Sequence, residues 1–155
     1  MFLYTVGYGL TNRVIQEQFQ HSAKTISRLF HKVLQACLKL STQYVKPLDP
    51  EFPSCHRNIS NDRRYFPYFK NAIGAIDGTH ISCVVSEDEH DKFVGRKGYP
   101  TQNIMAVCDW DMCFTYVLAG WEGTAHDARL FNSTLTTRRL NFPHPPQGIS
   151  STLAL

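Results

Sequence analysis

The sequence predicts an α+β chain, with a helical front segment followed by a mixed unit of three strands and a helix. Two periodicities and one compositional break indicate this. Apolar residues recur at helical spacing in residues 12–40, and short apolar runs between turn residues, typical of strands, occupy residues 72–120. Prolines interrupt the residues between them. We therefore predict a helical segment at 1–45, a linker at 46–62 and a second unit at 63–155.

The front segment contains two helix patterns, residues 12–19 and 23–40, separated by a short polar break. Ser22 suits the N-cap position of the second helix. A basic second helix after a short turn is the outline of a helix-turn-helix, which would present Lys24, Arg28 and Lys32 to DNA. The same pattern also suits a plain helical hairpin with a solvated basic face. The apolar stripe of the second helix comprises Ile26, Leu29, Phe30, Val33, Leu34, Cys37 and Leu38.

The second unit opens with "AIGAIDGTHISCVV" (72–85), an apolar strand with an aspartate, Asp77, in its middle. Residues 103–108 and 113–120 predict two more strands around the turn "DWDM". The segment "TAHDARLFNSTL" predicts a helix that Thr124 caps, with Asp127 three residues later as in a capping box. The predicted order is strand, strand, strand, helix.

Composition narrows the possible classes of protein. The chain is 43% hydrophobic and 19% charged, an ordinary globular balance, and no apolar run approaches the ~18 residues of a membrane span. Five cysteines without a C-x-x-C pair predict reduced thiols, in the nucleus or cytoplasm, and no zinc finger. Residues 1–76 carry ten Lys and Arg against four Asp and Glu, whereas residues 77–155 carry six against nine. This asymmetry suggests phosphate contact in front and metal binding behind, although it also suits simple solubility.

Four stretches carry a resemblance to a known family: "IGAIDGTHI" (73–81), "GRKGYPTQNIMAVCD" (95–109), "FTYVLAGWEGTAHDARL" (114–130) and "FPHPPQG" (142–148). They resemble the PIF/Harbinger transposase-derived nucleases of the DDE superfamily of endonucleases. Residues 12–34 also resemble the helical segment that precedes the nuclease domain in plant members. The resemblance implies a partial RNase H-like domain, DNA as substrate, Mg²⁺ or Mn²⁺ as cofactor, a nuclear location and a Myb-like DNA-binding protein as partner.

An ionised carboxylate in an apolar strand is unfavourable unless it is paired or binds a cation. The resemblance implies that Asp77 is a catalytic, metal-binding acid, whereas the residues alone also allow a turn cap or a buried ion pair. Gly78 would let the nucleic-acid backbone approach, and Thr79 and His80 would orient Asp77 or contact a phosphate. Asp127 is the weaker metal candidate because capping the helix explains it.

Two further features belong to the predicted site. Arg96 and Lys97, in the Gly-flanked "GRKGYP" loop, would contact DNA phosphates, with a solvated hairpin tip as the alternative. His126 precedes Asp127 and would approach the same cleft, or simply pack near the helix start.

The resemblance also implies two more acids, in "DAGY"-like and "ERAFG"-like motifs, and neither motif occurs in this sequence. We therefore expect that the 155-residue chain does not cleave DNA by itself. We also expect the sheet edge beside Asp77 to be unpaired, which would favour incomplete folding. The alternative is a non-catalytic DNA-binding or protein-interaction module derived from a transposase.

Overall fold

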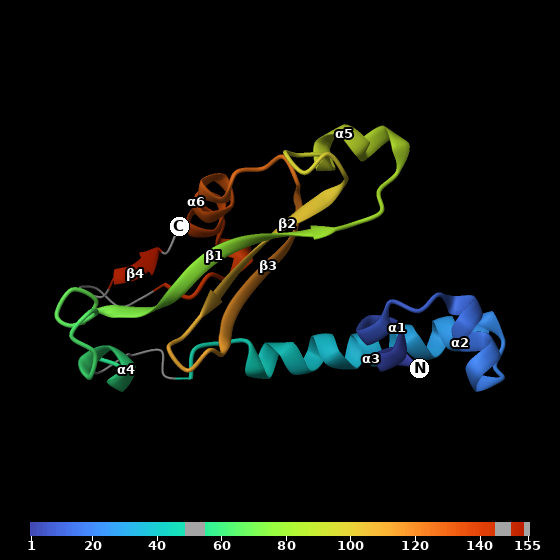
Figure 1. The fold of residues 1–155 in the computed structure, drawn as a ribbon, viewed down its shortest axis with the longest axis horizontal. Coiled ribbons are helices and arrows are strands. Elements are labelled where there is room, and N and C mark those ends of the chain that lie inside the picture. The colour runs from blue at the N-terminus through green and yellow to red at the C-terminus, as the bar shows by residue number, and fades with distance from the viewer. Residues whose placement is uncertain (49–54, 145–149, 154–155) are drawn as a thin grey trace. The chain divides into compact units, whose positions relative to one another are not determined.

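The structure is a computed structural model that describes residues 1–48, 55–144 and 150–153 (Figure 1). Its contacts divide the chain into two units, Met1–Tyr44 and Val45–Leu155. Helices form the first unit, and a sheet with short helices forms the second. The predicted α+β class is confirmed, while the helix-turn-helix geometry stays a prediction.

The helical unit comprises α1 (Phe2–Tyr8), α2 (Asn12–Phe19) and α3 (Ala23–Tyr44). The backbone N–H of Thr25 donates to Ser22 Oγ at 3.3 Å, which confirms Ser22 as the cap of α3. The side chains of Ile15 and Ile26 are buried between the helices. The later part of the predicted stripe on α3 is exposed, because α1 and α2 contact α3 near its beginning; Val33, Leu34 and Leu38 are 40%, 37% and 59% exposed.

The end of the predicted linker belongs to the second unit. Residues 49–54 lie outside the described residues, but Arg57–Ser60 form α4, and Ile59 is buried. Asn58 Nδ2 donates to the carbonyl oxygen of Trp110 at 2.8 Å, so α4 is tied to the turn between the second and third strands. That turn is closed as predicted, since Asp109 Oδ1 accepts the N–H of Asp111 at 3.0 Å.

A four-stranded sheet with the order β3-β2-β1-β4 forms the second unit. Its strands are β1 (Ala72–Ser82), β2 (Thr101–Cys108), β3 (Phe114–Glu122) and β4 (Ser150–Leu153). The first three pair antiparallel, with Asp77 opposite Ala106.

The fourth strand corrects the prediction of three strands and of an unpaired edge beside β1. β4 runs parallel to β1, pairing Ala72 with Ser150 and Ile76 with Leu153 (Figure 1). The pairs therefore reach Ile76, one residue before Asp77. The sequence does not predict this strand, because "ISSTLAL" is too short to show the alternation of apolar and polar residues that identifies a strand.

Helix α6 (Asp127–Thr136) covers one face of this sheet. Its Leu130 forms the core with Met105 and Ala125, and the partly buried side chains of Tyr116, Leu118, Trp121 and Phe131 pack around them. Alternation along β2 turns Thr101, Asn103 and Met105 toward this side, and all three are buried. Two polar residues therefore lie under the beginning of α6.

Three short helical turns complete the second unit: η1 (Glu87–Glu89), α5 (His90–Phe93) and η2 (Arg138–Leu140). Burial raises the pKa of Tyr116, whose hydroxyl donates to the Leu140 carbonyl oxygen at 3.0 Å and so holds η2 on the sheet. Within the described ranges, the helices are too short or too polar to cross a membrane.

Candidate active site

Asp77 lies at the point where β1 changes from buried to exposed. Ala72, Gly74 and Ile76 are buried, whereas Asp77 is exposed. The carboxylate is therefore not the buried charge that the apolar sequence around it predicts. Because side chains alternate along a strand, the side chain of Asp77 starts on the face of β1 opposite to that of Gly78. The carboxylate bends back toward the backbone, and its Oδ1 accepts the Gly78 N–H at 2.8 Å.

The carboxylate of Asp127 lies against the other side of Gly78. A Cβ at Gly78 would come within 2.6 Å of Asp127 Cγ, so only glycine leaves room for this side chain. Both carboxylates therefore contact Gly78: Asp77 accepts its N–H, and Asp127 packs against its Cα. The sequence predicts Gly78 as the point where a nucleic-acid backbone comes close, whereas in the structure the Asp127 side chain lies there.

The predicted capping box at the start of α6 is wrong. His126 occupies the N-cap position, and Asp127 is the first helical residue. Thr124 lies before the cap, and its Oγ1 donates to the Lys92 carbonyl oxygen at 2.9 Å, which joins this segment to α5. Asp127 thus makes no capping hydrogen bond, although its charge is favourable at a helix N-terminus.

Instead, Asp127 is held by Asn103, which sequence reasoning missed. Asn103 is fully buried, and its Nδ2 donates to Asp127 Oδ1 at 2.6 Å and to the Ala125 carbonyl oxygen at 3.0 Å. Its Oδ1 is buried without a hydrogen-bond partner among the described residues. The available signal was the pair of polar residues, Thr101 and Asn103, on a strand face that continues with the core residue Met105.

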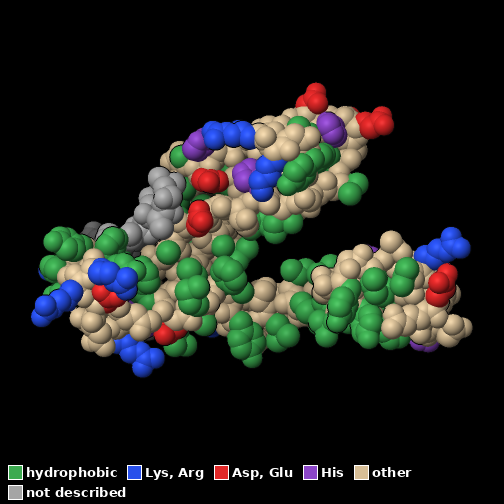
Figure 2. All heavy atoms as spheres, in the orientation of Figure 1, with side chains coloured by type: hydrophobic (Ala, Val, Ile, Leu, Met, Phe, Trp, Pro, Cys, Tyr) green, Lys and Arg blue, Asp and Glu red, His purple; other side chains and the backbone are tan. Residues whose placement is uncertain are grey.

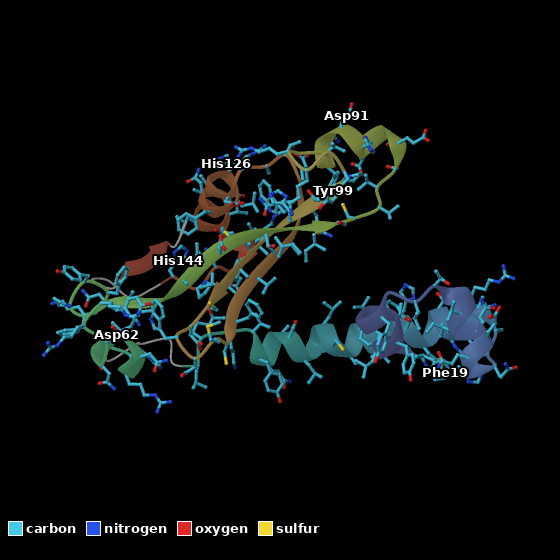
Figure 3. All side chains as sticks on the ribbon, viewed as in Figure 1. Phe19, Asp62, Asp91, Tyr99, His126 and His144 are labelled. Atoms are coloured by element: carbon cyan, nitrogen blue, oxygen red, sulfur yellow. The ribbon has the colours of Figure 1, made fainter. Side chains whose placement is uncertain are left out.

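A pocket of about 580 Å³ opens beside Asp127. Its polar lining side chains are His80, Arg96, Lys97, Thr101, Thr124, His126 and Asp127. His80 Nδ1 lies 3.2 Å from Thr101 Oγ1, which fixes the ring against β2. Figure 2 shows acidic, histidine and Lys or Arg side chains gathered on one face of the sheet unit, and Figure 3 shows His126 at the beginning of α6.

Neither Asp77 nor Thr79 lines the pocket, although both are exposed on β1. The structure therefore brings His80, His126 and Asp127 together and leaves Asp77 at the margin, in contact through Gly78.

The loop carrying Arg96 and Lys97 is a tight turn. The Gly98 N–H donates to the Gly95 carbonyl oxygen at 3.1 Å, and Gly98 has a φ of +74°, which favours glycine. Gly95 lies against the backbone of residue 123, where a Cβ would come within 2.7 Å of the carbonyl oxygen. This packing sets both basic side chains beside the start of α6, where they are exposed.

The donors at Gly78 fit a hard divalent cation in part. Mg²⁺ usually takes one or two carboxylates and completes its shell with waters and substrate phosphates. Asp77 and Asp127 supply two carboxylates, and Arg96 and Lys97 stand near to attract phosphate. In residues 1–48, 55–144 and 150–153, three or more His, Cys, Asp or Glu side chains do not gather into a group that could hold a metal.

Comparison with known proteins finds two family models and two relatives that resemble this chain. Residues 76–152 match the family model described as DDE superfamily endonuclease, and residues 1–39 match a domain of unknown function, DUF8040. "Protein ALP1-like" of Arabidopsis thaliana is 28% identical over 81% of this chain and 30% of its own length. "Putative nuclease HARBI1" of Rattus norvegicus is 26% identical over 76% of this chain and 33% of its own length. No solved structure matches.

The second unit therefore resembles a DDE superfamily endonuclease domain over residues 76–152. Together with the two relatives, this match makes the chain similar to the Harbinger-derived nucleases. The chain spans about a third of the length of these curated relatives.

Proposed function

We propose that this chain is part of a transposase-derived, divalent-metal-dependent DNA endonuclease, and that Asp77 and Asp127 hold the Mg²⁺ or Mn²⁺. The observation that carries the proposal is that both carboxylates contact Gly78, in a segment that matches a nuclease family. When bound, such a cation activates a water or 3′-hydroxyl and stabilises the leaving oxygen of a phosphodiester.

The chain's own residues would place DNA at this point. Arg96 and Lys97 would contact phosphates on either side of the scissile bond, because such contacts fix the position of the duplex without reading its sequence. His80 and His126 line the pocket between this loop and Asp127, where they would donate hydrogen bonds to phosphate oxygens. Thr79, exposed on β1, would face the DNA beside Asp77.

We further propose that the 155 residues alone do not cleave, because the reaction needs more carboxylates than the two at Gly78. The test is nicking of supercoiled plasmid in Mg²⁺, with Asp77→Ala as the site variant. Asp91→Ala is the matched control, since this aspartate side chain is fully exposed on α5. We expect no nicking by any of the three proteins. Nicking by wild type and Asp91→Ala that Asp77→Ala abolishes would show that the chain is a sufficient nuclease.

A second candidate function, a non-catalytic DNA-binding module, is favoured by the surface of α3. The helix contains no Asp or Glu, and Lys24, Arg28 and Lys32 are all exposed. Phosphate contacts by three lysine or arginine side chains would make the logarithm of the binding constant fall with the logarithm of the salt concentration, with a slope of roughly −2.7. An affinity that does not change with salt would contradict this function. In either case a nuclear location and a Myb-like DNA-binding partner are part of the proposal.

A further inference from the structure

A buried amide forms a hydrogen bond to the Asp127 carboxylate. Among the described residues, Asn103 is fully buried, and its side chain donates a hydrogen bond to a carboxylate of the site. Burying an amide is unfavourable unless hydrogen bonds compensate for the lost water. Both N–H bonds of Asn103 are satisfied, one by the Ala125 carbonyl oxygen and one by Asp127 Oδ1.

The orientation of this amide follows from its partners. Both neighbours of Nδ2 are acceptors, a carbonyl and a carboxylate, so the opposite orientation of the amide would place oxygen against oxygen. The remaining Oδ1 is buried and has no hydrogen-bond partner among the described residues. Among the described residues, the Asn103 amide therefore directs two donors at the start of α6, and its Oδ1 accepts no hydrogen bond. An apolar residue at this strand position would avoid the unpaired oxygen, but it would not hold Asp127.

Three contacts together restrict the Asp127 carboxylate. Asn103 Nδ2 donates to Asp127 Oδ1, and Gly78, which has no side chain, leaves room for the carboxylate. The backbone of Asp127 is held in the first turn of α6. Metal-binding carboxylates in proteins are commonly oriented by such hydrogen-bonded partners, and removal of a partner typically weakens metal affinity 10–100-fold.

We propose that Asn103 is a positioning residue: its buried amide holds the Asp127 carboxylate over Gly78 in the one orientation that serves a divalent cation. This inference rests on the proposed metal-binding function of the site and adds a residue to it. It implies that Asn103 acts through Asp127 and does not itself contact metal or DNA.

The test measures Mn²⁺ binding to the full 155-residue chain. Binding is monitored through the decrease of the electron paramagnetic resonance signal of free Mn²⁺. The variants are Asp127→Asn, Asn103→Ala and Gly78→Ala. Gly78→Ala adds a methyl group that would displace the Asp127 carboxylate, while the Asn103 side chain is unchanged. Asn58→Ala is the matched control, because it also removes a side-chain amide that donates to a backbone carbonyl, at 2.8 Å, in the same unit.

We expect Asn103→Ala and Gly78→Ala each to weaken Mn²⁺ binding 10–100-fold, and Asn58→Ala to leave it unchanged. Circular dichroism of each variant confirms that it is folded. Wild-type affinity in folded Asn103→Ala, with the loss seen only in Asp127→Asn, overturns the positioning role and leaves the proposed function intact. Absence of Mn²⁺ binding by wild type overturns the proposed function, and the inference with it.

A second measurement needs no variant and decides the question if Asn103→Ala does not fold. In a Mg²⁺ titration followed by ¹H–¹⁵N NMR, the two side-chain amide protons of Asn103 should shift with the same dissociation constant as the Asp127 backbone amide. Asn103 side-chain signals that stay unchanged at saturating Mg²⁺ would overturn the inference, while shifts at Asp127 alone would preserve the metal site.

Discussion

Leu130 attaches α6 to the sheet, so its truncation should loosen the site as well as destabilise the fold. Leu130 is 0% exposed and packs with Met105 and Ala125. A buried Leu→Ala change removes the transfer free energy of the side chain and leaves a cavity, so we expect Leu130→Ala to lower the free energy of unfolding by ~2–5 kcal/mol. For a unit of roughly 100 residues this lowers Tm by about 8–20 °C.

Leu135→Ala on the same helix is the control, because this leucine is 41% exposed and the substitution changes the same number of atoms. We expect it to lower the free energy of unfolding by less than about 1 kcal/mol. Thermal unfolding followed by circular dichroism, with urea titration for the free energies, measures both. Equal losses in the two variants, or a loss below about 1 kcal/mol in Leu130→Ala, would refute the packing of α6 on the sheet through Leu130.

Three further predictions concern the surface of each unit. Ser22→Ala should lower the free energy of unfolding by ~1 kcal/mol in urea titration, because it removes the cap of α3; an unchanged value would contradict the cap. The Arg64 guanidinium and, after it, the Arg64 backbone N–H lower the pKa of Asp62 to about 2, and NMR titration should show this midpoint in wild type and a higher one in Arg64→Gln, which keeps the backbone N–H. Because the folded-state pKa is lowered, the contribution of this pair to stability is fully present above about pH 4 and is lost as the pH falls through about 2; equal midpoints in the two proteins would exclude the interaction. The Arg96→Ala, Lys97→Ala double variant should reduce the salt slope of DNA binding by about 2, and an unchanged slope would remove the loop from the DNA interface.

The helices α2, α3 and α6 and the antiparallel strands were predictable because their signals are local. The bounds of α2 match the prediction, Asn12–Phe19, and the three antiparallel strands lie where apolar runs meet turn residues. These patterns depend on residues a few positions apart, which is the range that periodicity measures. β4 was missed because a short parallel strand is defined by its partner β1, whose paired residues lie 77 or 78 positions earlier in the chain, as in Ala72 with Ser150.

The site was harder to predict than the fold because its geometry depends on contacts between distant residues. The sequence indicated Asp77 and Gly78 as a site, but it explained Asp127 by a capping box that does not form. Asn103 lies 24 positions before Asp127, and within its strand it resembles any polar residue near the beginning. Only the register of β2 and the start of α6 bring the two side chains together.

Paramagnetic broadening by Mn²⁺ in ¹H–¹⁵N NMR spectra tests most directly whether a cation binds where the two carboxylates contact Gly78. Substoichiometric Mn²⁺ should broaden the backbone amides of Asp77, Gly78 and Asp127 first, and Asp127→Asn should abolish this selective loss of signal. Broadening that begins instead in the acidic segment Glu87–Asp91, or that spreads over the chain without selectivity, would contradict a metal site at Gly78.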